Sequence, residues 1–261
     1  MNVVIGGDKS LIFASGSNDV VSFRPTFWPT DIPGLSSWFS ADYGVYTNSN
    51  TLAQNGGLVS LWTSRINNIT LTQSTTSKQP TFLNGGVKFD GGDILGGINL
   101  SALNSPLNYY VAVDSISMNS TTTSPLAPPA PIIKQGAGAP NQGGPYGFIV
   151  DHGDILGAAN PIGQVSTINV TNQKTALACI IYNNDEAIIR KGNISNETVV
   201  ELGQATNAST SFFIGGYSNT YINQYMKGTI YEILVYAGTE HTFQQQNLVL
   251  QYLAQKWGLT I

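Results

Sequence analysis

The fold is decided by residues 228–259, which read GTIYEILVYAGTEHTFQQQNLVLQYLAQKWGL. The first part, residues 229–236, is β-branched and aromatic throughout, which is typical of a β-strand. Alternate residues of a strand share a face. One face consists of Tyr231, Ile233 and Val235, is wholly apolar, and is expected to lie against the core. Glu232 belongs to the opposite face, where a lone glutamate is predicted to be solvated or to cap a neighbouring element.

After Gly238 the spacing of the apolar residues changes from two to three and four. Thr242 and Gln245 match a capping box, in which each side chain binds a backbone N–H of the other residue. Gly258 is a candidate for the residue that ends the helix. The apolar stripe of an amphipathic helix follows from Val249, Leu250, Leu253 and Trp257. The segment therefore predicts a strand, a turn and one helix over residues 242–257.

Composition excludes several classes of function. The chain has 261 residues, a length that one all-β domain often reaches, and 41% of them are hydrophobic, enough for a full core. Only 10% are charged, against roughly 25% in ordinary globular proteins. The net charge of -4 argues against nucleic-acid binding, which needs a basic surface. We also expect no membrane insertion and no signal peptide, because no segment has either layout.

The remainder of the chain favours many short strands. Apolar runs recur between clusters of Gly, Asn, Asp and Pro, the pattern of a β-sandwich or barrel. Residues 120–131 are rich in Ser, Thr and Pro and are predicted to form a long exposed loop.

The N-terminal residues 1–33 differ from the rest in being broken by glycines and prolines. Two short apolar runs, residues 3–5 and 11–13, precede prolines at 25, 29 and 33. This pattern suits an extended arm that gains its order on a neighbouring surface. An extra edge strand of the domain is the alternative.

Three blocks of sequence, in the same order, resemble the laminin-G-like, concanavalin-A-like jelly-roll family found in phage and bacterial proteins. The first contains GLSSW and AD at residues 34–42, and the second contains LW, NN, QPT and VKFDG between residues 61 and 91. The third pairs GTIYEILVY at 228–236 with YLAQKWGL at 252–259. The resemblance covers residues 34–261 and is carried by the order of the blocks.

The resemblance implies two packed antiparallel sheets. The predicted fold is therefore all-β: a two-sheet antiparallel jelly-roll sandwich with one C-terminal helix and an N-terminal arm (1–33), which lies outside the resemblance. Residues 34–261 would form the jelly-roll domain. It also implies a role in binding glycans or proteins. Glycosidases of this fold carry a Glu-x-Asp-x-x-Glu strand motif, and no glutamate here is followed two residues later by aspartate. We therefore predict that the protein is not an enzyme.

Two aspartates in a glycine-rich corner, Asp90 and Asp93, are the candidate metal ligands. Calcium takes Asp and carbonyl oxygens in loops, so a Ca²⁺ site is the functional alternative there. Aspartates in such turns more often bind their own backbone, and we favour that interpretation. With one cysteine and two histidines, His152 and His241, no zinc cluster is expected.

A second candidate site lies in the polar loop between residues 215 and 228. Flat tyrosine rings beside amide groups suit a sugar face, although packing at the sandwich edge is the alternative. The candidate ligand-binding residues are Tyr217, Asn219, Tyr221 and Asn223.

The sequence-based hypothesis is a non-enzymatic virion structural protein: a phage capsid decoration protein or a short surface adhesin. Its expected partners are capsid or tail proteins, identical subunits bound through the arm, and surface glycans, and its expected location is the virion surface. A free glycan-binding lectin module is the alternative, and an enzyme acting on polysaccharide comes last.

Overall fold

The computed structural model describes the backbone of most strands and the side chains of the sandwich and its helix. The described residues are 2–6, 10–14, 20–23, 27–96, 106–119, 130–135, 148–151, 154–157, 167–170, 172–182, 186–191, 198–201, 212–216 and 225–259. Side chains are described for 27–96, 106–117, 132–133, 170, 172–180, 188–191, 212–216 and 225–259. Within these residues no helix is long and apolar enough to span a membrane.

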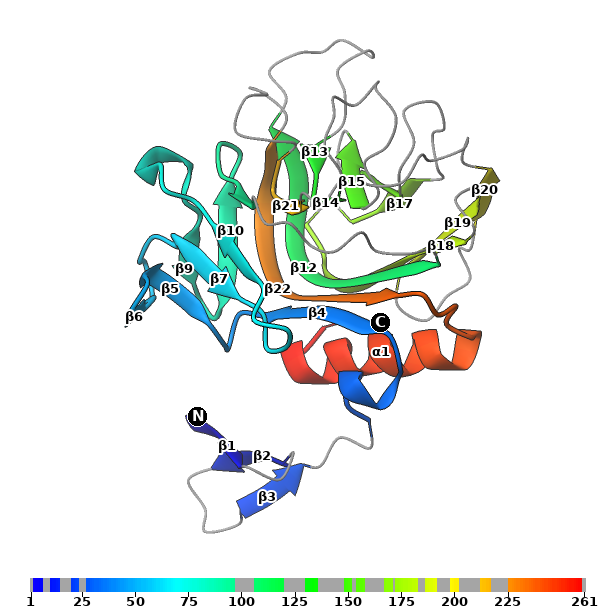
Figure 1. Cartoon of the computed structure of the whole chain (residues 1–261), viewed down its shortest axis with the longest axis horizontal. Helices are drawn as coiled ribbons and strands as arrows, with labels where there is room; N and C mark the ends of the chain where they lie inside the picture. The colour runs from blue at the N-terminus through cyan, green and yellow to red at the C-terminus, as the bar shows by residue number, and fades with distance from the viewer. Residues whose placement is uncertain are drawn as a thin grey trace.

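The larger of two principal sheets has eight antiparallel strands (Figure 1). In spatial order they are β20 (Thr198–Glu201), β19 (Glu186–Lys191), β18 (Lys174–Tyr182), β12 (Leu107–Asn119), β22 (Tyr225–Ala237), β10 (Gly86–Asp90) and β9 (Thr81–Leu83). The eighth strand, β4 (Leu35–Ser40), also pairs with β22. β10 pairs with the N-terminal half of β22, and β4 pairs with its C-terminal half. β12 and β22 have 13 residues each and form the middle of this sheet.

The second principal sheet has seven strands and faces the first. Its strands, in spatial order, are β14 (Ile133–Gln135), β21 (Phe212–Ile214), β11 (Leu95–Gly96), β8 (Thr70–Thr72), β7 (Leu61–Thr63), β5 (Val45–Asn48) and β6 (Thr51–Leu52). Two 3₁₀ turns, η1 (Pro29–Asp31) and η2 (Thr76–Lys78), lie between strands. This arrangement confirms the predicted all-β, two-sheet antiparallel sandwich.

Two smaller sheets complete the described strands. β1 (Asn2–Gly6), β2 (Ser10–Ala14) and β3 (Val20–Phe23) form an antiparallel meander. β13 (Ala130–Pro131), β15 (Phe148–Asp151), β16 (Asp154–Gly157) and β17 (Thr167–Asn169) form the other. The role of residues 1–33 as an anchoring arm stays a prediction.

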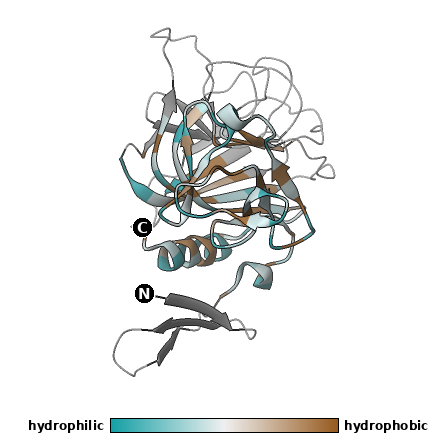
Figure 2. Ribbon diagram, turned by 90° about the vertical axis from the view of Figure 1, so that its left-hand side faces the viewer, coloured by the Kyte–Doolittle hydropathy of each residue, from teal (hydrophilic) through white to brown (hydrophobic). Residues whose placement is uncertain are grey.

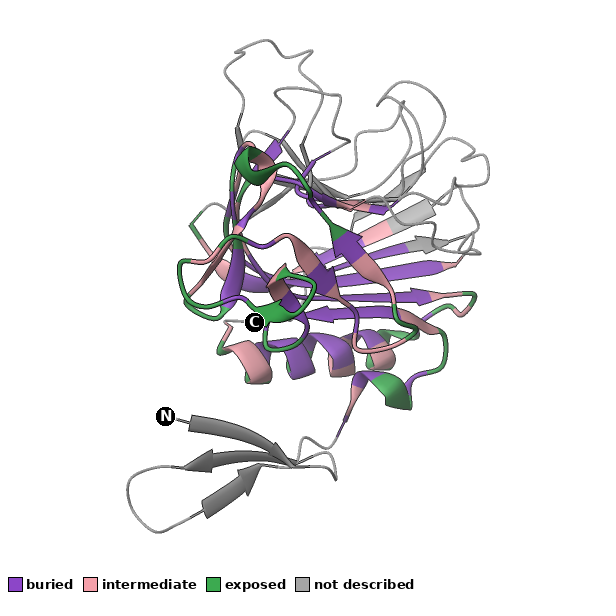
Figure 3. Cartoon of the chain, turned by 60° about the vertical axis from the view of Figure 1, so that its left-hand side comes forward, coloured by how far each residue is buried: buried purple, intermediate pink, exposed green. Residues whose placement is uncertain are grey.

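The core lies between the two principal sheets, and a second apolar layer lies beneath the helix. Hydrophobic residues follow the strands of the sandwich in Figure 2, and Figure 3 shows the central strands of the large sheet buried over most of their described length. Trp62, Phe39 and Phe89 are fully buried in the first layer. The second layer packs the outer face of the large sheet against α1 (Phe243–Trp257).

The single α-helix of the described residues has the predicted ends. The Thr242 hydroxyl accepts the backbone N–H of Gln245 at 3.3 Å, and the Gln245 side chain accepts that of Thr242 at 2.8 Å. Gly258 adopts φ 62° and ends the helix in the left-handed conformation. The apolar stripe predicted from the sequence is the face that packs on the sheet, through Val249, Leu250 and Leu253.

The strand before the helix departs from the predicted alternation at one residue. Ile233 and Val235 face the core as expected, but Tyr231 lies with the helix layer and Ile230 takes its place in the core. The cause is a β-bulge: Ala112 pairs with Glu232, yet the next residue, Val113, pairs with Ile230. The extra residue reverses the alternation beyond it. The predicted face of Tyr231 was therefore wrong.

Glu232 is the main correction to the sequence interpretation, because it is completely buried beneath the helix rather than solvated or capping. Its carboxylate accepts the indole N–H groups of Trp38 and Trp257, each at 2.6 Å, and the hydroxyl of Tyr252 at 2.9 Å. The Lys256 ammonium lies 2.7 Å from the same carboxylate. A buried charge is tolerated when it is paired and hydrogen-bonded, and these four partners supply both.

We call this arrangement the Glu232 network, and it extends to the protein surface through Asp42. The Asp42 carboxylate lies 3.4 Å from the Lys256 ammonium and 2.8 Å from the Arg65 guanidinium. Burial alone would raise the pKa of Asp42, but the charges of Lys256 and Arg65, together with hydrogen bonds from Ser40 and Arg65, outweigh it, so the pKa lies below its ordinary value. The network thus joins β4, β22 and α1, and it gathers residues of the first and third family-like blocks.

Candidate functional site

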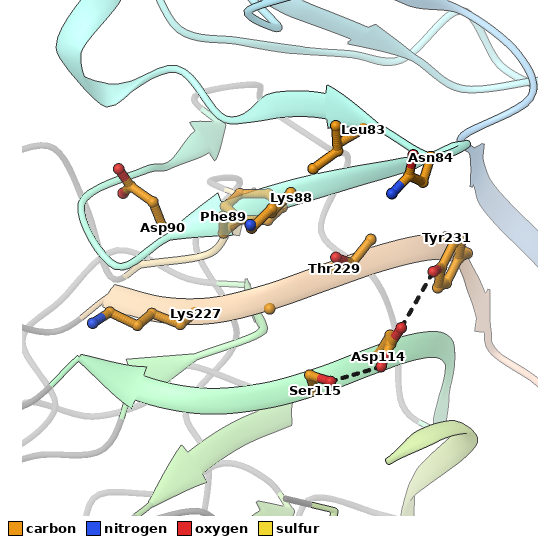
Figure 4. A pocket seen from close by; sticks show the side chains of 11 residues that line it. Leu83, Asn84, Lys88, Phe89, Asp90, Asp114, Ser115, Lys227, Thr229 and Tyr231 are labelled. Carbon is orange, nitrogen blue, oxygen red and sulfur yellow. Dashed lines mark hydrogen bonds between the residues drawn. The ribbon is translucent and has the colours of Figure 1, made fainter. Parts of the chain in front are cut away.

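An open groove of about 540 Å³ lies on the outer face of the large sheet, where α1 does not cover it (Figure 4). A volume of 300–1,000 Å³ is typical of ligand sites. Its floor comes from the adjacent strands β10, β22 and β12 and its rim from the β9–β10 turn. The lining residues are Leu83, Asn84, Lys88, Phe89, Asp90, Asp114, Ser115, Lys227, Gly228, Thr229 and Tyr231.

Bulges in the two long strands shape the groove. In β12 the register shifts between Asp114 and Ser117, and Ser115 adopts φ 53°, a conformation that residues other than glycine rarely take. On the facing strand, a Cβ on Gly228 would lie 3.0 Å from the Asp114 carbonyl oxygen. Only glycine lets the backbones approach this closely. The irregularity exposes the Ser115 side chain beside Asp114.

A row of polar residues crosses five strands through this groove. The strand registers place Lys88 opposite Thr81 on one side and opposite Thr229 on the other. They place Asp114 opposite Thr229 and Lys174. Residues directly opposite each other in a sheet share a face. The outer face is therefore polar here, whereas the same face is apolar under the helix.

The two carboxylates of the groove are already hydrogen-bonded within the protein. Asp114 accepts the Ser115 hydroxyl at 2.8 Å and lies 3.5 Å from the hydroxyl of Tyr231 (Figure 4). Asp90 accepts the backbone N–H of Gly92 at 2.8 Å. Burial, and then the nearby Asp114 charge, raise the pKa of Tyr231, which keeps this phenol protonated at neutral pH.

Tyr231 connects the groove to the helix layer. Its ring lies 5.3 Å from the ring of Trp257, centroid to centroid, and the Lys174 ammonium lies 4.7 Å above it. The same ammonium donates to the Trp257 carbonyl oxygen at 2.7 Å, in the last turn of α1. A cation stabilises the C-terminus of a helix through its dipole. Lys174 therefore lies where the apolar part of the outer sheet face, under α1, meets the polar part in the groove.

The predicted metal ligands Asp90 and Asp93 lie in one turn, and the two residues are hydrogen-bonded to each other. The buried Asp93 carboxylate accepts the backbone N–H of Asp90 at 2.8 Å, which is the turn role that the sequence interpretation favoured. Across the described part of the chain, no three His, Cys, Asp or Glu side chains gather where they could hold a metal ion. Calcium binding at this pair stays a prediction.

Asp93 should make stability depend on pH. Its burial, together with the nearby Asp90 charge, raises its pKa from 3.8 to about 7. A carboxyl with a raised folded-state pKa stabilises the fold below about pH 4, and this contribution is lost as the pH rises through 7. Asp93→Asn keeps an acceptor for the Asp90 N–H but cannot ionise. We expect it to raise the melting temperature at pH 8, relative to the wild type, and to leave it nearly unchanged at pH 4.

Thermal melts of both proteins from pH 4 to pH 8 measure this difference. The exposed Glu240→Gln change is the control and should leave the shape of the wild-type profile unaltered. If Asp93→Asn follows the wild-type profile in parallel, Asp93 ionises normally and its burial carries no penalty.

The structure does not test the candidate ligand-binding residues of the polar loop between residues 215 and 228. Tyr217, Asn219, Tyr221 and Asn223 lie outside the described residues, as does His152. His241 is buried, its ring Nδ1 lies 2.7 Å from the Tyr110 hydroxyl, and burial lowers its pKa to about 4. Its environment is that of a packed neutral side chain.

Sequence reasoning missed Lys88, Asp114, Lys227 and Thr229 as site residues. A signal was present, because Lys88 and Asp90 alternate with the buried Val87 and Phe89. That alternation indicates an outward polar face, but only the strand order shows which outward residues meet.

Comparison with known proteins gives matches of structure only. No family model matches the chain, and no curated protein matches it in sequence. Trypanosoma rangeli sialidase matches with a TM-score of 0.54 and 14% identity over 88% of this chain and 34% of that one. A GH54 α-L-arabinofuranosidase matches with a TM-score of 0.56 and 11% identity over 84% of this chain and 62% of that one. The chain thus spans about a third of the sialidase and under two thirds of the arabinofuranosidase, and the likeness concerns the fold.

These matches correct the sequence-based function. The sialidase and the arabinofuranosidases that share the fold of this chain are carbohydrate-active enzymes, and these matches give no support to a phage or virion protein. The interpretation as a virion structural protein was therefore wrong. The family resemblance holds in its coarser form, a β-sandwich of a kind present in carbohydrate-related proteins. Because the identities are so low, the absence of catalysis stays a prediction.

Proposed function

We propose that this protein is a glycan-binding β-sandwich domain that holds a sugar chain in the groove between β9 and β12 without cleaving it. One observation carries the proposal: the part of the large sheet left bare by α1 is hollowed and lined by polar side chains from neighbouring strands. Ser115 in this groove adopts φ 53°, and strained backbone of this kind is common at functional sites.

The chemistry of the groove suits sugars. Lys88 and Lys227 can donate hydrogen bonds, Asp114 retains acceptor capacity, and the Thr229 hydroxyl can do both. Sugar hydroxyls need donors and acceptors set close together, and the polar row supplies them in one line. The similarity in fold to a sialidase and to arabinofuranosidases supports a carbohydrate ligand.

Binding is favoured over hydrolysis by the state of the groove carboxylates. Glycosidases generally need one carboxyl group to donate a proton and a second to act as nucleophile or base. Here Asp114 is engaged by Ser115 and Tyr231, and Asp90 by the turn that follows it. We further propose that the domain belongs to the laminin-G-like, concanavalin-A-like group, because residues of its closing block meet in the Glu232 network.

A blocking substitution tests this function. Thr229 lies on the floor of the groove, so Thr229→Tyr should fill it and weaken binding at least about tenfold, a loss of about 1.4 kcal/mol. Affinity electrophoresis against a panel of neutral and acidic polysaccharides, followed by calorimetry on those that retard the protein, measures the effect. The matched control is Thr72→Tyr on the exposed end of β8, in the other sheet, which should bind as the wild type does.

Three outcomes decide against the proposal. Failure of the wild type to bind any polysaccharide of the panel would remove glycan binding. Equal binding by a folded Thr229→Tyr variant would place the site elsewhere. Release of reducing ends from a bound polysaccharide, lost in Asp114→Asn, would make the groove an active site.

A further inference from the structure

The charged side chains of the groove differ in whether they have hydrogen-bond or ion-pair partners within the protein. The two carboxylates accept hydrogen bonds at 2.8 Å, Asp114 from the Ser115 hydroxyl and Asp90 from the Gly92 N–H. The two lysines, Lys88 and Lys227, are exposed, and no residue whose side chain is described hydrogen-bonds or ion-pairs with them. The groove thus offers two ammonium groups to a ligand, while its negative charges are partly engaged.

The strand register sets the two lysines side by side. Lys88 lies opposite Thr229 and Lys227 lies opposite Asp90, so the lysines are diagonal neighbours on adjacent strands. Diagonal neighbours of an antiparallel pair lie about 7–8 Å apart. Two flexible lysine side chains at that spacing can both reach one carboxylate placed between them. Figure 4 shows both side chains on the groove face, one on β10 and one on β22.

We infer that the ligand of this groove is a sugar acid, a glycan unit that carries a carboxylate, bound by Lys88 and Lys227. This inference rests on the proposed glycan binding and names the class of sugar. The carboxylate forms charge-assisted hydrogen bonds to the two ammonium groups, which are stronger than bonds between neutral groups. The hydroxyls of the same sugar donate to the remaining lone pairs of Asp114 and bond with Thr229.

The neighbouring carboxylates argue against more highly charged ligands. Asp90 and Asp114 line the same groove, and the protein as a whole has a net charge of -4. A nucleic acid or a heavily sulfated chain would place several anionic groups against these carboxylates, which repel them. A sugar acid carries one carboxylate with hydroxyl groups beside it. The groove presents two lysine ammonium groups with carboxylate and hydroxyl acceptors beside them, so the two patterns are complementary.

Paired ligands that differ only in charge test the inference. Polygalacturonate, alginate and polysialic acid are each compared with their methyl-esterified forms, which keep the hydroxyls and lose the charge. We expect at least one acid to bind about tenfold or more tightly than its ester, with an affinity that falls as NaCl is raised. Lys88→Gln and Lys227→Gln should each weaken binding of that acid about tenfold, while Lys88→Arg should retain most of it.

The control is Lys78→Gln, in the 3₁₀ turn η2, which does not line the groove and should not change binding. If an acid and its ester bind equally, the sugar-acid inference is wrong and glycan binding stands. The same conclusion follows if neutral glycans bind and the lysine variants bind them as the wild type does. If nothing in the panel binds the wild type, glycan binding itself fails, and the sugar-acid inference fails with it. If binding persists in Thr229→Tyr but is lost in both lysine variants, the carboxylate is bound outside the groove floor, which also overturns the inference.

Discussion

Replacing Glu232 with alanine is expected to lower the free energy of unfolding by about 3–5 kcal/mol. The carboxylate is fully buried and holds the indole N–H groups of Trp38 and Trp257, the Tyr252 hydroxyl and the Lys256 ammonium. Its removal takes the acceptor from these donors and from the Ser40 hydroxyl, and it leaves the Lys256 ammonium with Asp42, at 3.4 Å, as its remaining counter-charge. Unsatisfied buried donors add to the cost.

Chemical denaturation followed by far-UV circular dichroism measures this loss. The exposed Glu240→Ala change is the matched control and should stay within about 0.5 kcal/mol of the wild type. Glu232→Gln should fall between the two, because it keeps an acceptor oxygen but leaves the Lys256 charge with only the more distant Asp42 carboxylate to compensate it. A Glu232→Ala protein as stable as the wild type would mean that the network contributes nothing and that the helix is held by apolar packing alone.

Trp62→Ala is expected to cost about 3–5 kcal/mol, the range observed when large aromatic side chains are removed from a core. Trp62 is fully buried between the sheets, its ring packs against Phe39 at 5.9 Å, and its indole N–H donates to the Ser40 carbonyl oxygen at 3.2 Å. Truncation would create a large cavity and remove one of the two donors to that carbonyl, which also accepts the Tyr43 N–H at 2.9 Å.

The same denaturation experiment on Leu52→Ala supplies the comparison, since Leu52 is 56% exposed on the edge strand β6. That change should cost well under 1 kcal/mol. If the two truncations cost the same, the space between the sheets is not the close-packed core described above.

The sequence predicted what depends on residues close together in the chain. The capping box of Thr242 and Gln245, the helix stop at Gly258 and the β composition of residues 229–236 each involve a few neighbouring residues. Local propensity and periodicity therefore placed the last strand and the helix within a few residues of their observed ends.

The features that could not be predicted from the sequence depend on contacts between residues that are far apart in the chain. Glu232 is buried because Trp38 and Trp257 approach it from opposite ends of the sequence, and no local pattern shows that approach. The bulge at Tyr231 follows from pairing with β12, which reverses the alternation that composition alone predicts. The groove has the same origin, because it combines outward residues of three strands whose order is not readable from spacing.

The span of the Glu232 network also sets an order of events during synthesis on the ribosome. Trp38 and Glu232 are separated by 194 positions, and Trp257 lies a further 25 beyond Glu232. Strands made early, including β4, must therefore wait for β22 and α1 to emerge before their outer face is covered. Contacts this distant in sequence form late and slowly. Until then the nascent chain exposes an aromatic surface, and that interval is when chaperones would have the most to bind.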